Sequence, residues 1–333
     1  MFSSYHGKAG WLLMALVLTL TLASCAVVEQ PPEAVATPGV DGGQAEKPPL
    51  PSRITEFDTE VPMINVYVTD TGTVEKQSIE DYLTGVLAGE MRNDWPMEAL
   101  KAQAILARTF TLRFMTEKES KYDGADVSTD IEEAQAYDKS GVNERIQQAI
   151  DETRGTVLVS AGASGSEFPY AWFHAHSGGK TALAKEGLDY EQDEPTYTTV
   201  ADGNESEAAP EDARQWTAQF SPETVMQAAN LSGGMSSIEI GEKGESGRAL
   251  TLIINGESVK APTLRIAIGS TEMRSTLLDE VKLEDGTVTM SGKGYGHGVG
   301  MSQWGAYGMA ESGSSAEDIV THYFKDVSIV KMW

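Results

Sequence analysis

An apolar run near the N-terminus constrains this chain more than any other feature, because it leads to the only cysteine in the sequence. Lys8 supplies a basic start, the apolar run covers residues 11–23, and Ser24 and Cys25 follow. This layout is typical of a secretory signal. We therefore assign residues 1–25 to targeting and expect the folded part of the protein outside the cytoplasm.

The end of this run, Leu22-Ala23-Ser24-Cys25, resembles a bacterial lipobox, in which the cysteine is lipidated and becomes the new N-terminus. An uncleaved signal anchor is the alternative, because apolar residues continue to Val28 and a membrane span needs roughly 20 of them. Either arrangement attaches the protein to the cell membrane through its N-terminus. We expect lipidation of Cys25.

Composition limits what the rest of the chain contains. No cysteine follows Cys25, so disulfides and thiolate zinc sites are excluded from the folded part. Residues 26–55 are rich in Pro, Ala, Gly and Glu, which predicts a flexible linker. The net charge of -25 argues against nucleic acid and anionic lipid as partners, whereas a neutral or weakly charged polymer is compatible with it.

Residues 56–333 suffice for one large domain or two closely joined lobes, the second beginning near Phe220. Helices and strands mix without regular alternation, which predicts an α+β class with antiparallel hairpins. Asn255-Gly256 is a hairpin signal, and a second hairpin is expected between residues 155–160 and 169–176. Further strands are expected over 61–69, 250–254 and 287–291, and helices from Ser78, from Pro96 to Met115, and over 143–153, 301–311 and 315–324.

The first helix carries a carboxylate on its apolar face. Ile79, Leu83 and Val86 share one stripe, and Glu90 lies about 20° from Ile79 at roughly 100° per residue. Burial raises the pKa of a carboxyl, and a general acid needs a raised pKa near neutral pH. Glu90 is therefore the candidate acid/base, and Gly89 would let a substrate approach the backbone. A solvated helix end or an ion pair would also explain this position.

Four ordered blocks of sequence resemble the stage II sporulation protein D family. The first contains Ala88-Gly89-Glu90-Met91 and the second Gln135-Ala136-Tyr137. The resemblance extends from about Val61 to the C-terminus, and its blocks cover residues 82–109, 135–137, 173–181 and 296–306.

This resemblance implies a lytic transglycosylase that cuts the glycan strands of peptidoglycan, preferably strands stripped of stem peptides, during engulfment of the forespore. The family's catalytic glutamate maps onto Glu90, which would protonate the glycosidic oxygen and then deprotonate the C6 hydroxyl that attacks C1. No cofactor is implied. Related domains enhance a cell-wall amidase, so a non-catalytic glycan-binding partner of an amidase is the alternative. An amidase and other engulfment proteins are the expected partners.

The residues expected to contact the glycan lie in the same blocks and in the second helix. Lys101 and Arg108 share a face of that helix, where a structural ion pair is the alternative to contact with sugar or with Glu90. Packing is likewise the alternative for His297, in a glycine-rich loop, and for Tyr137. The expected substrate-binding residues are Lys101, Arg108, Gln135, Tyr137, Ser177, Gly178, Lys180, His297 and Gln303.

Metal is not expected in this protein. Some family members hold zinc through cysteines near the Gln-x-Tyr block, but residues 122–137 here contain neither cysteine nor histidine. A zinc site formed by His174, His176 and His297 is the weaker rival, because the sequence contains no H-E-x-x-H motif and no evident acidic ligand.

Overall fold

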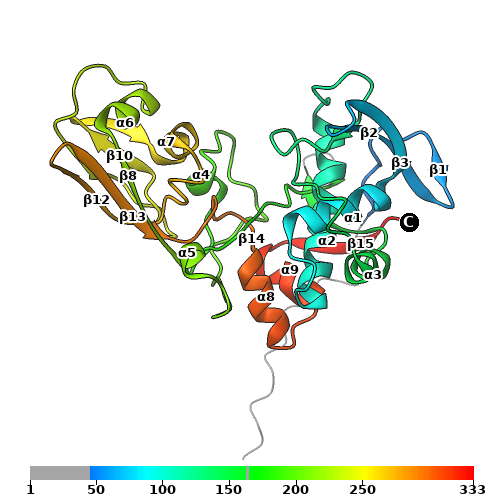
Figure 1. The fold of residues 1–333 in the computed structure, drawn as a ribbon. Helices are drawn as coiled ribbons and strands as arrows, with labels where there is room; N and C mark the ends of the chain where they lie inside the picture. The colour runs from blue at the N-terminus through cyan, green and yellow to red at the C-terminus, as the bar shows by residue number, and fades with distance from the viewer. Residues whose placement is uncertain (1–45, 163–164) are drawn as a thin grey trace, which may run out of the picture. The chain divides into compact units, whose positions relative to one another are not determined.

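The computed structural model describes residues 46–162 and 165–333 (Figure 1). The predicted signal peptide, the predicted lipidation site Cys25 and the predicted linker as far as residue 45 lie outside the described residues. Among the helices that are described, none has both the length and the hydropathy needed to cross a bilayer.

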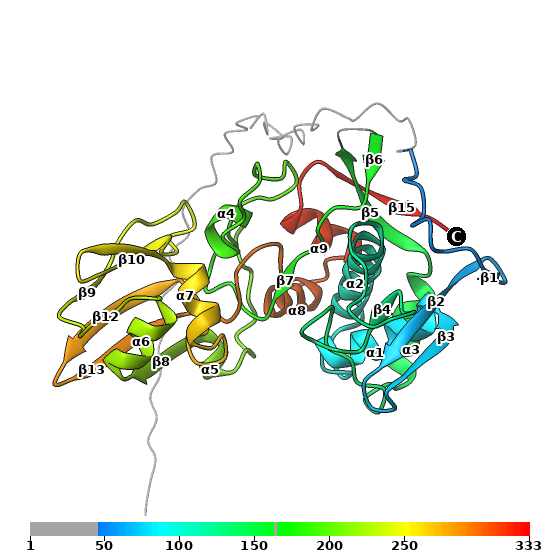
Figure 2. The same cartoon turned by 90° about the horizontal axis from the view of Figure 1, so that it is seen from above.

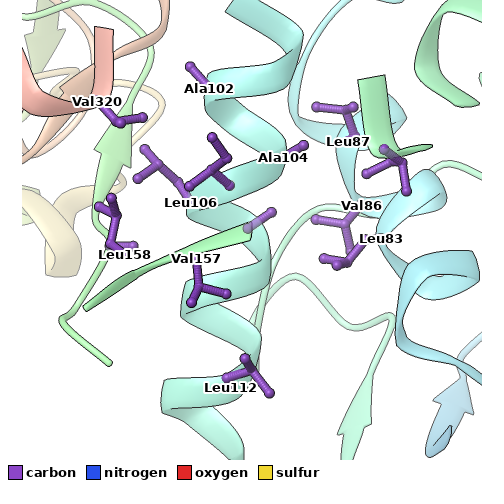
Figure 3. Close-up of a cluster of buried hydrophobic side chains, with 14 of the residues drawn as sticks. Leu83, Val86, Leu87, Ala102, Ala104, Leu106, Leu112, Val157, Leu158 and Val320 are labelled. Carbon is purple, nitrogen blue, oxygen red and sulfur yellow. The ribbon is translucent and has the colours of Figure 1, made fainter. Parts of the chain in front are cut away.

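Helix α2 (Met97–Glu117) lies at the centre of the larger hydrophobic core. Helices α1 (Ile79–Glu90), α3 (Glu144–Glu152), α8 (Gln303–Glu311) and α9 (Ala316–Tyr323) pack against it (Figure 2). Figure 3 shows this core, in which Leu83, Val86 and Leu87 of α1 lie on the side of α2 to which Ala104 points, whereas Ala102 and Leu106 point to the other side, toward Val320 and Leu158. The amphipathic stripe expected on the first helix is therefore buried.

Local signals for these helices are confirmed. The side chain of Ser78 accepts a hydrogen bond from Asp81 N at 3.1 Å and so caps α1. Pro96 directly precedes α2, where it lacks an N–H that the first turn would leave unpaired. The hydroxyls of Thr109 and Thr111 donate hydrogen bonds of 2.7 and 2.8 Å to backbone carbonyls one turn earlier in α2. Because these polar groups are satisfied, both side chains can be buried in the core.

Two sheets flank this core. In one, β1 (Phe57–Asp58), β2 (Val61–Val68) and β3 (Thr73–Ser78) are antiparallel, and β4 (Val127–Ser128) joins β2 in parallel. In the other, β5 (Thr156–Gly162) lies between β15 (Val327–Lys331) and β6 (Gly165–Glu167).

The hairpin expected between residues 155–160 and 169–176 is wrong. Strand β5 takes its long partner, β15, from the C-terminal end of the chain. Strand β7 (Phe173–His174) pairs in parallel with β14 (Met301–Ser302). Both partners are distant in sequence, so the local alternation that predicted the hairpin contains no information about them.

A second hydrophobic core lies between residues 216 and 290, with Trp216, Leu252, Leu264 and Met290 among its buried members. The hairpin expected at Asn255-Gly256 is confirmed, because both residues have positive φ, 53° and 86°. The α+β class is also confirmed. The elements of this part are β8 (Gln215–Phe220), α6 (Pro222–Ala228), β9 (Ile238–Ile240), β10 (Thr251–Ile254), β11 (Glu257–Lys260), α7 (Ala261–Ile268), β12 (Leu278–Glu284) and β13 (Thr287–Lys293).

Buried polar contacts connect this second part to residues 177–187. The fully buried Arg248 donates to Ser177 O at 2.6 Å and to Lys180 O at 2.9 Å. Glu186, in the short helix α4 (Ala184–Gly187), accepts from Ser246 N at 3.2 Å. These contacts satisfy polar groups that would otherwise be costly to bury.

Arg108→Met should destabilise the protein strongly, because Arg108 is fully buried and pairs with Glu80 at 2.6 Å. Removing one partner of a buried ion pair costs about 3–5 kcal/mol, and urea unfolding followed by circular dichroism measures this loss. The control is Arg92→Met, because the Arg92–Asp94 pair is exposed, and it should unfold like the wild type. Equal midpoints for Arg108→Met and the wild type would contradict this role for the buried pair.

Candidate active site

Glu90 is the last residue of α1, and its side chain is partly buried. Its Oε1 accepts a hydrogen bond of 2.7 Å from Ala136 N. Burial raises the pKa of the Glu90 carboxyl to about 7, and the Ala136 N–H opposes this rise because it favours the charged form. The carboxyl is therefore poised to exchange a proton near neutral pH.

A loop that contains Ala136 and Tyr137 packs directly on α1. Asp138 N donates to Gly85 O at 2.9 Å. A Cβ on Gly89 would lie 2.6 Å from Tyr137 N, and a Cβ on Gly85 would overlap the Tyr137 ring. Gly89 therefore makes room for this loop, which occupies the space expected for a substrate. The loop in turn places the Ala136 N–H against Glu90.

Two residues of the Gln-x-Tyr block position this loop. The Tyr137 ring stacks on Tyr82 with centroids 5.8 Å apart, and half-burial leaves part of it accessible. Gln135 is buried, and its Nε2 lies 3.2 Å from Thr111 Oγ1 of α2. In this structure Gln135 therefore anchors the loop to α2 and has little surface to offer a glycan.

The start of α8 closes the site from the other side. Gln303 Nε2 donates to the backbone O of Glu90 at 3.0 Å, although the two residues lie far apart in sequence. Ser302 caps α8 by accepting from Gly305 N at 3.2 Å. The Trp304 ring packs against Trp95 with centroids 4.5 Å apart, the packing role that aromatic residues most often have.

The structure does not bring Lys101 or Arg108 to Glu90. Lys101 Nζ lies 2.9 Å from Glu98 Oε1 and also pairs with Glu152. Arg108 is fully buried and paired with Glu80, so it has no surface for a sugar. For both residues the geometry supports a structural ion pair and not the expected contact with substrate.

The second group of expected site residues gathers around a different carboxylate. Glu205 Oε1 accepts from Ser177 N at 2.8 Å, from the Ser177 hydroxyl and from the Ser302 hydroxyl at 3.2 Å. Gly178 N donates to His176 Nδ1 at 3.0 Å, and the Lys180 side chain is exposed. No sequence signal marks Glu205, because it lies among acidic and small residues outside any motif.

His297 stays neutral in this environment. Burial lowers the pKa of His297 to about 3, and Nδ1 accepts from Val299 N at 3.0 Å. Its ring centroid lies 5.7 Å from that of His174, whose pKa burial also lowers. Within residues 46–162 and 165–333, no three His, Cys, Asp or Glu side chains are arranged to hold a metal ion.

Glu90 should make folding stability depend on pH. Folding raises the pKa of its carboxyl from 4.5 to about 7, so stability falls as pH rises through this window. The loss is at most about 3 kcal/mol, and solvent screening of the partly exposed carboxyl reduces it. Glu90→Gln should therefore gain stability relative to the wild type between about pH 4 and about pH 8 in urea titrations. A constant difference would contradict the raised pKa.

Comparisons with known proteins identify relatives of this chain. The family model for Stage II sporulation protein matches residues 67–159, which include α1, α2 and the loop at Ala136. Stage II sporulation protein D of Bacillus amyloliquefaciens is 33% identical over 282 residues, covering 80% of this chain and 78% of the relative. Its counterpart in Bacillus subtilis (strain 168) is 30% identical over 281 residues, covering 80% of this chain and 78% of the relative.

A further relative has a different name. The Amidase enhancer of Bacillus subtilis (strain 168) is 27% identical over 295 residues, covering 74% of this chain and 40% of that protein. The two proteins named Stage II sporulation protein D are more similar to the chain and match most of their own length. The chain belongs to the stage II sporulation protein D family.

Proposed function

We propose that this protein is a lytic transglycosylase that cleaves the glycan strands of peptidoglycan, with Glu90 as its general acid/base. The observation that carries this proposal is the partly buried Glu90 carboxyl, whose pKa is about 7 and whose Oε1 accepts the Ala136 N–H. Near neutral pH such a group can both give and take a proton.

The chemistry assigns both proton transfers to one carboxyl. Glu90 first protonates the glycosidic oxygen as the bond from C1 to that oxygen breaks. The resulting carboxylate then takes the proton of the C6 hydroxyl, whose oxygen forms the new bond to C1 and closes an anhydro ring. The Ala136 N–H binds Oε1, so we assign proton transfer to Oε2. This hydrogen bond strengthens as charge develops on the carboxylate, which favours the first step.

Hydrolysis by two carboxylates is less well supported. The next acidic residues along the chain are Asp94, which pairs with Arg92 at 2.9 Å, and Glu98. Glu98 binds Lys101 and also accepts from Ala316 N at 2.8 Å. Both carboxylates are thus engaged elsewhere, whereas the lytic reaction requires Glu90 alone.

The location and timing of this activity are also proposed. We place the protein outside the cytoplasm, attached to the cell membrane through its N-terminus by lipidation of Cys25, and acting during engulfment of the forespore. A second function, as a non-catalytic glycan-binding partner of a cell-wall amidase, is supported by the similarity to a protein named Amidase enhancer.

Glu90→Gln separates these two functions. The amide keeps an oxygen that accepts the Ala136 N–H but cannot donate an acidic proton. Release of anhydro-ended sugars from peptide-free glycan should fall by about 10²–10⁴-fold in mass spectrometry, with binding to the glycan retained. Asp94→Asn removes an exposed carboxyl and should act like the wild type. Undiminished cleavage by Glu90→Gln would exclude Glu90 as the acid, and products with reducing ends would indicate hydrolysis.

The pH dependence of cleavage tests the same carboxyl. The first step needs protonated Glu90, so kcat/KM should fall as pH rises above about 7. Initial rates between about pH 5 and about pH 9 at constant ionic strength measure this limb. Rates that stay level from pH 6 to pH 8 would contradict a proton donor with this pKa.

A further inference from the structure

A surface pocket of about 290 Å³ lies beside the turn that follows β7. Its lining includes His176 and Gly178, the carboxylates of Glu205 and Glu207, and the cations of Arg214 and Lys293. Arg214 ends the short helix α5 (Glu211–Arg214), and Lys293 ends β13. The proposed reaction at Glu90 makes no use of this pocket.

Hydrogen bonds connect the pocket to the start of α8, where Glu90 is held. Glu205, in the pocket wall, accepts from the Ser302 hydroxyl at 3.2 Å. The next residue, Gln303, donates to Glu90 O at 3.0 Å. The pocket wall and Glu90 thus both contact the same segment, the start of α8.

The wall of the pocket is closely packed and contains a buried nitrogen without a hydrogen-bond partner among the described residues. His176 is 5% exposed, and its Nε2 has no hydrogen-bond partner among the residues that the structure describes. A Cβ on Gly178 would lie 3.1 Å from the Lys293 side chain, so the turn packs closely against β13. The turn that forms this wall is therefore closely packed against its neighbour.

Two cations in this pocket are only loosely paired. The Arg214 side chain is 41% exposed, and its partner Glu207 is 98% exposed, so this pair contributes little. Lys293 Nζ lies 3.6 Å from Asp279 Oδ1, with both side chains about half exposed. The Glu205 side chain, by contrast, is only 9% exposed, and its Oε1 is engaged by two serines. In a chain with a net charge of -25, the pocket thus keeps two cations available for an anion.

We propose that this pocket is a subsite for a sugar carboxylate of the glycan strand, with Arg214 and Lys293 as its cationic groups. The inference rests on the proposed function and extends it to substrate selection. A guanidinium and an ammonium together suit a carboxylate through charge-assisted hydrogen bonds. The lactyl carboxyl of muramic acid is free only after its stem peptide has been removed, because the attached peptide makes it an uncharged amide. The subsite therefore selects peptide-free strands.

Binding measured in the Glu90→Gln variant tests the subsite, because this variant leaves the strand uncut. The two ligands are peptide-free glycan oligosaccharides and the same oligosaccharides with their carboxyls converted to methylamides. Isothermal titration at low salt should show tighter binding of the carboxylate form. Adding Arg214→Gln or Lys293→Gln should each weaken that preference by about threefold to tenfold. Lys282→Gln is the matched control, because Lys282 on β12 is 46% exposed, as Lys293 is.

The outcomes separate the subsite from the reaction. Equal affinity for the two ligands, or an undiminished preference in both added variants, overturns the subsite while glycan binding stands. A preference that depends on Arg214 and Lys293 supports the subsite even if the wild type releases no anhydro sugars, a result that would refute only the lytic assignment. Failure to bind either ligand overturns both.

Discussion

The buried Glu80–Arg108 pair is the interaction on which the packing around α1 and α2 depends. Glu80 lies in the first turn of α1 and Arg108 in the middle of α2, so the pair sets how these helices pack. The same carboxylate accepts Gly155 N and Trp333 Nε1, each at 3.0 Å. One buried charge thus joins both helices, the approach to β5 and the C-terminal residue. Moving any of these segments would leave a polar group buried without a partner.

The two ends of α1 illustrate how surroundings determine what a glutamate does. Glu80 lies against a guanidinium and several other donors, and this environment makes it a structural anion. At the other end of the helix, Glu90 has the Ala136 N–H as partner and is partly buried, which raises the pKa of its carboxyl to about 7. The rigid packing around Glu80 holds α1 in place, so that Glu90 meets both the loop at Ala136 and the start of α8.

A second carboxylate, Glu205, organises the other half of the site, and its side chain is only 9% exposed. It ties the turn at Ser177 to Ser302 at the start of α8. Arg248 fastens the same turn to the second hydrophobic core through Ser177 O. The turn, α8 and β13 therefore form one continuous framework, on which the proposed reaction at Glu90 and the proposed carboxylate subsite share a common support.

The sequence alone determined features that depend on neighbouring residues. The stripe of Ile79, Leu83 and Val86 predicted which face of α1 is buried, Ser78 and Pro96 predicted where helices begin, and Asn255-Gly256 predicted a turn. These signals are reliable because capping, helical periodicity and positive φ are local properties. The same periodicity placed Glu90 on the buried face.

Only the tertiary structure decided which distant groups meet. In the tertiary structure β5 pairs with β15, and Lys101 and Arg108 form ion pairs. Gly89 lies against Tyr137, and Glu205 accepts hydrogen bonds from Ser177. None of these outcomes follows from local pattern. The sequence around a charged residue does not specify whether its side chain contacts solvent, substrate or a buried counterion. The partner is chosen when the chain packs, and with it the pKa and the function of the group.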